Sequence, residues 1–213
     1  MIEITLLATD WSGVVSDDRQ PVYYANMALL AQFGKSTFPF EDWLPRTRLS
    51  AAEFLADHGI TEDPNHLNRL FKAEYERAVS SGIVPTAYPD ASEVLQFLHQ
   101  AGFPIDVISS HPEENLRREA QDYGVERYLR SVQGSTRDKA EGLAKLCESA
   151  GVNPQKVLYL GDTIYDIQAA KKAGVRSAGI STGYHLAERL AAENPDVLLP
   201  NLTKLKEVIR LGA

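Results

Sequence analysis

The chain contains a single cysteine, Cys147, so no internal disulfide can form. This excludes a small secreted scaffold held together by disulfides, and it favours a reducing compartment such as the cytoplasm. No run of residues approaches the ~18 consecutive apolar positions that a membrane-spanning helix needs, so we expect no membrane partner. The first residues, MIEITLLATDW, lack the basic start that is typical of a signal peptide.

Basic residues are also few relative to acidic ones. The chain has 22 lysines and arginines against 29 acidic residues, which gives a formal net charge of -7 over 213 residues. An acidic surface repels phosphate backbones, and this excludes general nucleic-acid binding. The hydrophobic content of 44% is ordinary for a globular protein and excludes wholesale disorder. At roughly 100–200 residues per domain, the length allows one domain or a core with a smaller insert, and the oligomeric state stays open.

Two patterns of hydrophobic residues divide the chain. The apolar run from Ile2 to Ala8 is short, contains β-branched residues and leads into the loop signal Asp10-Trp11-Ser12-Gly13. It therefore predicts a buried strand. From about Pro21 to Pro85 the apolar residues instead repeat at helical spacing, and no convincing strand is predicted. The clearest helical stripe consists of Leu67, Leu70, Phe71, Tyr75, Ala78 and Val79.

From Pro89 onward, predicted strands and helices alternate. The predicted strands lie at 105–108, 129–132, 157–160, 177–180 and 197–199, and the last two close the chain with a helix between them. The predicted helices cover 94–100, 112 to about 124, 138–150 and 166–173. Pro112 suits a first helical turn, and the pair Ser110 and Glu113 predicts a capping box there.

This alternation predicts an α/β fold with a doubly wound parallel sheet, in which helices cover both faces. The helical block interrupts the pattern after the first strand. We therefore expect a core domain from residues 1–18 and 88–213, with a helical domain inserted at 19–87. Ligands bind at the carboxyl ends of the strands in such sheets. Polar clusters follow three of the predicted strands, at 10–12, 109–110 and 162–166, so they should meet at one edge.

The acidic residues at this edge indicate a cation site. Asp10 and Asp162 follow separate strands, and Asp166 lies one helical turn beyond Asp162. Like charges are brought together at low cost only when a cation lies between them, and a set of oxygen ligands without His or Cys favours Mg²⁺. With the hydroxyl of Ser109 and the charge of Lys139, such a site is equipped to hold a phosphoryl group. A free carboxylate in it is a candidate nucleophile.

These residues resemble the four motifs of the haloacid dehalogenase (HAD) superfamily. The matching segments are Thr9 to Asp17, the strand-end Ser109, the isolated Lys139, and Gly161 to Asp166 with Ala169 to Gly174. Their order and spacing agree with the family pattern. The resemblance covers the whole chain, because the helical insert lies where this family carries its C1-type cap.

The resemblance implies a role for each matching residue. Asp10 is the nucleophile and a metal ligand, and the backbone carbonyl of Ser12 is a second ligand. Lys139 holds the nucleophile and the phosphate. Two further metal ligands are implied, Asp162 and Asp166, the latter often through water. Ser109 is the implied phosphate-binding hydroxyl. Ser110, beside it, is either a second substrate-binding hydroxyl or a helix cap.

One departure concerns the catalytic position two residues after Asp10. HAD phosphatases usually carry an aspartate there as general acid and base, and this chain has Ser12. A hydroxyl does not exchange protons at neutral pH as a carboxylate does, and general acid–base help is typically worth ~10²–10⁴-fold. We therefore expect a slow phosphatase unless another group substitutes. His111 stands beside the expected site and is one candidate for that group, the other interpretation being a capping or surface histidine.

The leading hypothesis is a Mg²⁺-dependent phosphatase that acts on a small phosphorylated metabolite. A catalytically impaired phosphate-binding or regulatory protein is a second hypothesis, motivated by Ser12. The third is a phosphonatase-like hydrolase of C–P bonds, because those relatives also lack the second aspartate. Such an enzyme needs a cap lysine for a Schiff base, and the insert offers Lys35 and Lys72. A dehalogenase is disfavoured, since it does not need the full acidic metal site.

Overall fold

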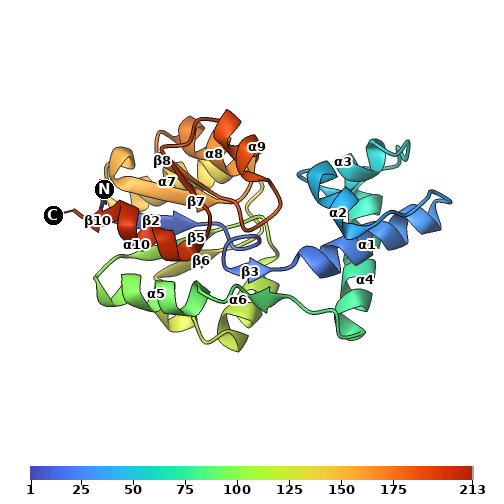
Figure 1. Ribbon diagram of the computed structural model, residues 1–213, viewed down its shortest axis with the longest axis horizontal. Coiled ribbons are helices and arrows are strands. Elements are labelled where there is room, and N and C mark those ends of the chain that lie inside the picture. Colours follow the sequence, from blue (N-terminus) through green and yellow to red (C-terminus); the bar gives the residue numbers. More distant parts are fainter. Residues whose placement is uncertain (213) are drawn as a thin grey trace. The chain divides into compact units, whose positions relative to one another are not determined.

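A computed structural model describes residues 1–212, which divide into two compact units. The larger unit contains Met1–Asp17 and the residues from Ala87 onward, and the smaller one contains Asp18–Thr86. In the larger unit, helices cover both faces of a central sheet (Figure 1). None of the helices in the described part of the chain has the length and apolar character required to cross a membrane.

The central sheet has six strands, all parallel, in the order β6-β5-β2-β7-β8-β9. The α/β fold with a parallel sheet is therefore confirmed. The six strands are β2 (Leu6–Thr9), β5 (Ile105–Ile108), β6 (Ser131–Gln133), β7 (Val157–Gly161), β8 (Arg176–Ile180) and β9 (Val197–Leu199). The helices between and after them are α5 (Ala91–Gln100), α6 (Glu113–Asp122), α7 (Lys139–Ala150), α8 (Ile164–Ala173), α9 (Ala187–Ala192) and α10 (Leu205–Val208). Short 3₁₀ turns cover Glu126–Tyr128, Pro154–Lys156 and Leu202–Lys204.

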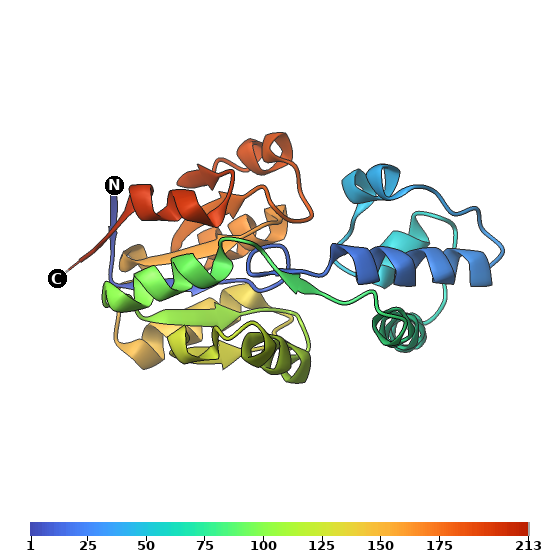
Figure 2. The same cartoon turned by 60° about the horizontal axis from the view of Figure 1, so that its bottom comes forward.

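Alternate side chains of the buried strands enter two different cores. One core packs strand residues such as Leu7 and Leu158 against α5, α6 and α10. The other packs Leu6 and Tyr159 against α7 and α8. Helices therefore lie on both sides of the strands, as Figure 2 shows from a second direction. This arrangement explains the continuous apolar runs in the sequence, because strands that are buried on both faces show no polar alternation.

The order in which the strands are added to the sheet changes direction at β2, and this change places the candidate site. From β2 the chain builds outward through β5 and β6 on one side, and through β7, β8 and β9 on the other. Thr9 pairs with Val107 on one neighbour and with Leu160 on the other. The residues that follow these three strands therefore lie level at one edge. A switch point of this kind is where open α/β sheets bind their ligands.

The two ends of the chain depart from the prediction. The expected strand over residues 2–8 is split at Thr5, because β1 (Ile2–Ile4) pairs with β10 (Ile209–Leu211) in a separate parallel sheet. The prediction that β9 closes the chain is therefore wrong, since α10 and β10 follow it. Thr5 lies between the two strands, and its backbone N–H donates to the carbonyl of Lys156 at 2.8 Å.

The smaller unit is built from helices. They are α1 (Arg19–Gln32), α2 (Phe40–Trp43), a 3₁₀ turn (Leu44–Arg46), α3 (Ala51–Ala56) and α4 (Pro64–Ser80). Ser50 caps α3 and Asp63 caps α4 through side-chain oxygens that accept backbone N–H groups. Residues 21–85 contain no strand, as expected, and β4 (Thr86–Ala87), which follows them, pairs with β3 (Ser16–Asp17).

Candidate active site

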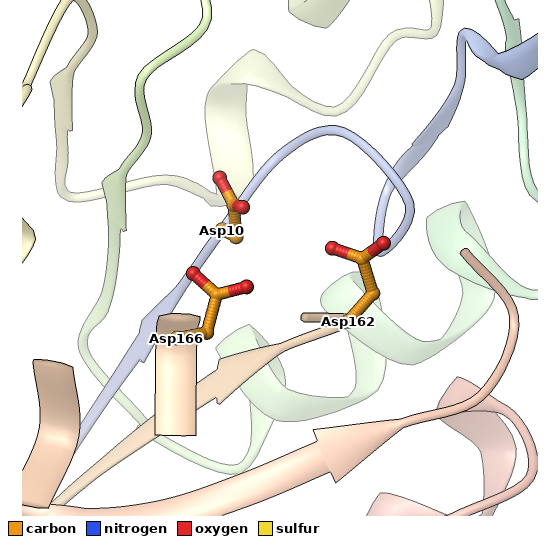
Figure 3. Close-up of side chains that lie close together, drawn as sticks. All are labelled: Asp10, Asp162 and Asp166. Carbon is orange, nitrogen blue, oxygen red and sulfur yellow. The ribbon is translucent and has the colours of Figure 1, made fainter. Parts of the chain in front are cut away.

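Three buried aspartates meet at the carboxyl edge of the central sheet. Asp10 follows β2, Asp162 follows β7, and Asp166 lies in the first turn of α8. The three residues are 5%, 1% and 1% exposed, and ligand oxygens of the three lie within 4.8 Å of one another. Figure 3 shows the three carboxylates gathered in one group. The structure thus brings together the acidic residues that the sequence predicts to share an edge.

Lys139 connects two of these carboxylates. Its ammonium group donates to Asp10 Oδ2 at 2.6 Å and to Asp166 Oδ1 at 2.6 Å. It is held there because it is the first residue of α7, whose N-cap is Asp138. Burial acts to lower the pKa of Lys139, but the charges of Asp10 and Asp166 outweigh it and raise that pKa well above the usual value. Lys139 therefore stays charged at the centre of the site.

Asp10 is held at both carboxylate oxygens. Oδ2 accepts from Lys139, and Oδ1 accepts the backbone N–H of Trp11 at 2.7 Å. Burial raises the pKa of Asp10 and the charge of Asp166 adds to this, while Lys139 and a hydrogen bond from Ser109 act in the opposite direction. The hydroxyl of Ser109, which is 1% exposed, is therefore a direct neighbour of this carboxylate. The predicted phosphate-binding serine and the predicted nucleophile lie together.

Asp166 acts as a helix cap as well as a partner of Lys139. Its Oδ2 accepts from the backbone N–H of Thr163 at 3.0 Å and from the Thr163 hydroxyl at 2.6 Å, which forms a capping box on α8. The hydroxyl of Tyr159 lies 3.3 Å from Oδ1. Burial acts to raise the pKa of Asp166, but Lys139 outweighs it and the pKa lies below its usual value.

Asp162 is fixed by the loop after β8, which the sequence analysis did not include in the site. The backbone N–H of Tyr184 donates to Asp162 Oδ2 at 2.7 Å, and His185 N–H donates to the Asp162 carbonyl at 3.3 Å. Burial, followed by the charges of Asp166 and Asp10, raises the pKa of Asp162 well above its usual range. In the sequence, this loop is marked only by its place after a predicted strand of the same sheet.

Two glycines leave room for the Asp162 carboxylate. A Cβ built on Gly183 or on Gly13 would overlap Asp162 Oδ2. We expect Gly183→Ala to lower the free energy of unfolding by about 1–3 kcal/mol through overpacking, and to reduce activity because the carboxylate must move. Denaturant unfolding together with an activity assay measures both effects.

Gly151→Ala is the control for this prediction. Gly151 ends α7 at φ 63° with nothing within 4 Å of an added Cβ. Alanine there should lower stability through backbone strain and leave activity unchanged. An unchanged activity in Gly183→Ala would contradict the close fit around Asp162.

The other two predicted serines differ in their surroundings. Ser110 is exposed, and the predicted capping box with Glu113 is wrong, because Pro112 is the N-cap of α6 and supplies no side-chain cap. The chain instead uses a capping box on α8. Ser12 is half-buried, and its Oγ lies 3.4 Å from His111 Nδ1.

His111 and Glu119 form a buried pair that contacts the loop after Asp10. The sequence indicates His111 as a candidate site residue and does not indicate Glu119. His111 Nε2 lies 3.1 Å from Glu119 Oε1, and the side chains are 7% and 9% exposed. Glu119 lies on α6 at a position that reads as an ordinary polar helix residue, so no local signal marked it.

The group of acidic residues fits a divalent cation. Three buried carboxylates stand against one ammonium group, so the described residues around Asp10 carry more negative than positive charge. The ligand atoms are oxygens only, which suits a hard ion. Asp10, Asp162 and Asp166 each offer a carboxylate oxygen to such an ion. Such an excess of buried negative charge is stable only with a compensating cation or with protonation.

The lysines of the smaller unit give no sign of Schiff-base chemistry. The side chain of Lys72 is 73% exposed and lies 3.7 Å from Glu76. A Schiff-base lysine is activated by a desolvated pocket or by another cation, and Lys72 has an acidic partner in solvent instead. Lys35 likewise lies in an exposed position.

Comparison with known proteins identifies relatives of the chain. Residues 10–180 match the family described as haloacid dehalogenase-like hydrolase. Phosphoglycolate phosphatase from Vibrio parahaemolyticus is 33% identical over 131 residues, which is 59% of this chain and 58% of that protein. Phosphoglycolate phosphatase 1 from Pseudomonas aeruginosa is 27% identical over 214 residues, covering 94% of this chain and 78% of the relative. The chain thus spans less than two thirds of the length of the Vibrio relative.

Solved structures share the fold over almost the whole chain. A hydrolase of the haloacid dehalogenase-like family from Streptococcus pneumoniae has a TM-score of 0.85 at 15% identity, covering 96% of this chain and 97% of that one. A predicted phosphoglycolate phosphatase from Haemophilus somnus has a TM-score of 0.80 at 17% identity, covering 98% and 99%. At these identities the similarity establishes the arrangement of the elements.

Proposed function

Because this chain belongs to the haloacid dehalogenase-like hydrolases, we propose that it is a Mg²⁺-dependent phosphatase acting through a phosphoryl-aspartate on Asp10. The observation that carries the proposal is the setting of Asp10, which is buried, held at both oxygens and bridged by Lys139 to a second acid. A carboxylate oriented in this way is suited to nucleophilic attack. The substrate is a small phosphorylated metabolite.

In the first step, an oxygen of Asp10 attacks phosphorus and the bond to the ester oxygen breaks. The ester oxygen leaves as an alkoxide, which takes a proton from water because Ser12 stands where an acid would supply it, and the phosphoryl group stays on Asp10. Lys139 places its charge beside Asp10 Oδ2, where it stabilises negative charge on the transferred group. Ser109, next to Asp10, offers a hydroxyl to a phosphoryl oxygen. Asp10, Asp162 and the Ser12 carbonyl would hold Mg²⁺, with Asp166 in support, and the ion would supply further stabilisation of charge on the phosphoryl oxygens.

In the second step, water attacks phosphorus and the bond to Asp10 breaks. Inorganic phosphate leaves, and the carboxylate of Asp10 is restored. The chain has Ser12 where a carboxylate would assist the proton transfers of both steps, so turnover is slow. A phosphoryl group held on Asp10 between the two steps gives the proposal a direct experimental signature.

The relatives suggest the first compound to test. The matched Vibrio and Pseudomonas proteins are named phosphoglycolate phosphatases. We propose a small phosphorylated organic acid as the substrate class, and 2-phosphoglycolate as its first member. A panel of other phosphorylated metabolites, assayed by phosphate release with Mg²⁺, tests how narrow the preference is.

Lys139→Met tests the proposed chemistry within that panel. Removing the charge next to the transferred group should lower kcat/KM by about 10²–10³-fold. Lys145→Met is the matched control on the same helix, because Lys145 is 67% exposed and pairs with Glu141 at the surface. Equal rates in the two variants would contradict the role of Lys139. Thermal unfolding of both variants separates lost chemistry from lost structure.

A phosphate-binding or regulatory protein without turnover is the second candidate, and Ser12 is the observation that favours it. The two candidates differ in one result. A phosphatase releases phosphate in repeated turnovers, whereas a binding protein takes up inorganic phosphate or a phosphorylated metabolite and releases nothing. Calorimetric binding with the same panel, run beside the phosphate assay, distinguishes them.

A further inference from the structure

The loop between β8 and α9 contacts the loops that follow two other strands. The hydroxyl of Thr182 donates to the carbonyl of Gly13 at 2.8 Å, in the loop after β2. The backbone N–H of Tyr184 donates to Asp162 Oδ2 at 2.7 Å, directly after β7. Gly183 lies between these two contacts, and a Cβ built on it would overlap both Gly13 Cα and Asp162 Oδ2. Figure 3 shows the Asp162 carboxylate beside the loop after β2, which is drawn in pale blue.

These contacts hold two of the proposed ligands of Mg²⁺. Asp162 offers a carboxylate oxygen, and Ser12 offers its backbone carbonyl, which belongs to the same peptide group as the N–H of Gly13. That N–H donates to the carbonyl of Ser16 at 2.8 Å. Because the C=O and N–H of a trans peptide point in opposite directions, this hydrogen bond directs the Ser12 carbonyl away from Ser16. The Thr182 hydroxyl then holds the next carbonyl along the chain, that of Gly13.

Gly13 needs such support because it is a flexible point of this loop. Its φ of 76° lies in the left-handed region, which glycine adopts freely, and it has no side chain that could fix it by packing. The direction of its two peptide groups is therefore set by hydrogen bonds, to Ser16 on one side and from Thr182 on the other. Without the Thr182 hydroxyl, we expect the neighbouring Ser12 carbonyl to take a wider range of directions.

Tyr88 holds Thr182 in place from a third part of the chain. The hydroxyl of Tyr88 donates to the carbonyl of Thr182 at 2.8 Å, and its backbone N–H donates to the carbonyl of Val15 at 3.0 Å. Tyr88 is 9% exposed and packs in the core that includes residues of α5 and α6. It therefore connects the loop after β8 to the loop after β2 a second time.

We propose that Thr182 is a positioning residue for the metal site, and that it sets the spacing between the Ser12 carbonyl and the Asp162 carboxylate. The inference rests on the Mg²⁺-dependent function proposed above. The two ligands follow different strands, and Mg²⁺ requires near-ideal octahedral geometry with ligands at about 2.0–2.1 Å, so it tolerates little change in their spacing. Residues that orient metal ligands typically contribute about 10–100-fold to metal affinity.

Thr182→Val tests the inference, because it removes the hydroxyl and leaves a side chain of similar size. We expect the Kd for Mg²⁺ to rise by about tenfold. Thermal unfolding over a range of Mg²⁺ concentrations, without substrate, gives this Kd, since the gain in stability depends on the concentration of the ion relative to Kd. Each variant is compared with itself without metal. A general loss of stability therefore leaves the Mg²⁺ concentration at which the gain begins unchanged.

Three further variants complete the experiment. Thr182→Ser keeps the hydroxyl and should retain the Kd of the natural protein. Thr203→Val is the matched control, because it removes an exposed hydroxyl that donates to Asp90 at 3.0 Å, and it should also retain that Kd. Tyr88→Phe removes the hydroxyl that holds the Thr182 carbonyl and should raise the Kd for Mg²⁺. It provides the test if Thr182→Val does not fold.

An unchanged Kd for Mg²⁺ in Thr182→Val would overturn the inference, as would an unchanged Kd in Tyr88→Phe where Thr182→Val does not fold. A rise of the same size in Thr182→Ser or in Thr203→Val would overturn it as well, because the hydroxyl of Thr182 would then not be the cause. A natural protein whose stability does not respond to Mg²⁺ would overturn the metal-dependent function itself, and this inference with it.

Discussion

Asp10→Asn should abolish turnover, with kcat lower by at least about 10³-fold, because an amide cannot form the phosphoryl-aspartate. The amide also cannot replace the carboxylate in its contacts. One side of Asp10 accepts from Trp11 N–H and the other from Lys139, and asparagine offers an acceptor to only one of them. Steady-state phosphate release with 2-phosphoglycolate and Mg²⁺ measures the loss.

The variant should keep its affinity for phosphate. Asp10 is a negative group beside the position proposed for an anionic substrate, so removing its charge lowers repulsion while it removes the nucleophile. We therefore expect inorganic phosphate to bind at least as tightly to Asp10→Asn as to the natural protein. Asp122→Asn, at an exposed position that ends α6, is the control and should leave both quantities unchanged. Substantial turnover by Asp10→Asn would rule out covalent catalysis at this residue.

Removal of divalent metal should be the second large effect. Treatment with EDTA should lower kcat by at least about 10³-fold, and excess Mg²⁺ should restore it, since the ion supplies several kcal/mol of charge stabilisation in sites of this type. The physical reason lies in the charges of the site. Asp10, Asp162 and Asp166 are buried together with a single lysine, so a divalent ion balances them.

The metal should also stabilise the fold, which can be measured without any substrate. A ligand that binds only the folded state at about 100 times its Kd raises the free energy of unfolding by about 2.7 kcal/mol. We expect thermal unfolding with Mg²⁺ to show a gain of this order, and we expect Asp162→Asn to lose most of it. Asp122→Asn should keep the full gain. Equal activity and equal stability with Mg²⁺ and with EDTA would show that the acidic group holds no functional ion.

The central sheet could be predicted because its signals are local. Short apolar runs that end at polar clusters marked β2, β5 and β7, and periodic helices were predicted between the later strands. The prediction failed where pairing is between distant parts of the chain. Nothing near Ile2 indicates that Ile2–Ile4 pairs with Ile209–Leu211, and this pairing splits the expected first strand.

The candidate site could be predicted in its side chains but not in its supporting groups. Asp10, Lys139 and Asp162 are charged residues at strand or helix ends, so topology alone indicates that they meet. The backbone of Tyr184 holds Asp162 through an N–H group that every residue has, and no sequence pattern marks it. Glu119 is similar, because only the three-dimensional packing of α6 shows that its carboxylate is buried against Trp11 and His111.

Helix caps could likewise be predicted only in part from the sequence. The pair Ser110 and Glu113 has the spacing of a capping box, yet Pro112 is the N-cap of α6 and Ser110 is exposed. The capping box instead lies at Thr163 and Asp166. Sequence spacing therefore shows which side chains are able to cap a helix, but not which of them does.

An acid-quench experiment shows whether a phosphoryl group passes onto Asp10. The enzyme is mixed with 2-phosphoglycolate and Mg²⁺, quenched in acid within the first turnover, digested and analysed by mass spectrometry. We expect the mass of one added phosphoryl group on the peptide that contains Asp10, and none in Asp10→Asn. Phosphate release in the first turnover from an enzyme that carries no phosphoryl group, or carries it on another residue, would rule out Asp10 as the nucleophile.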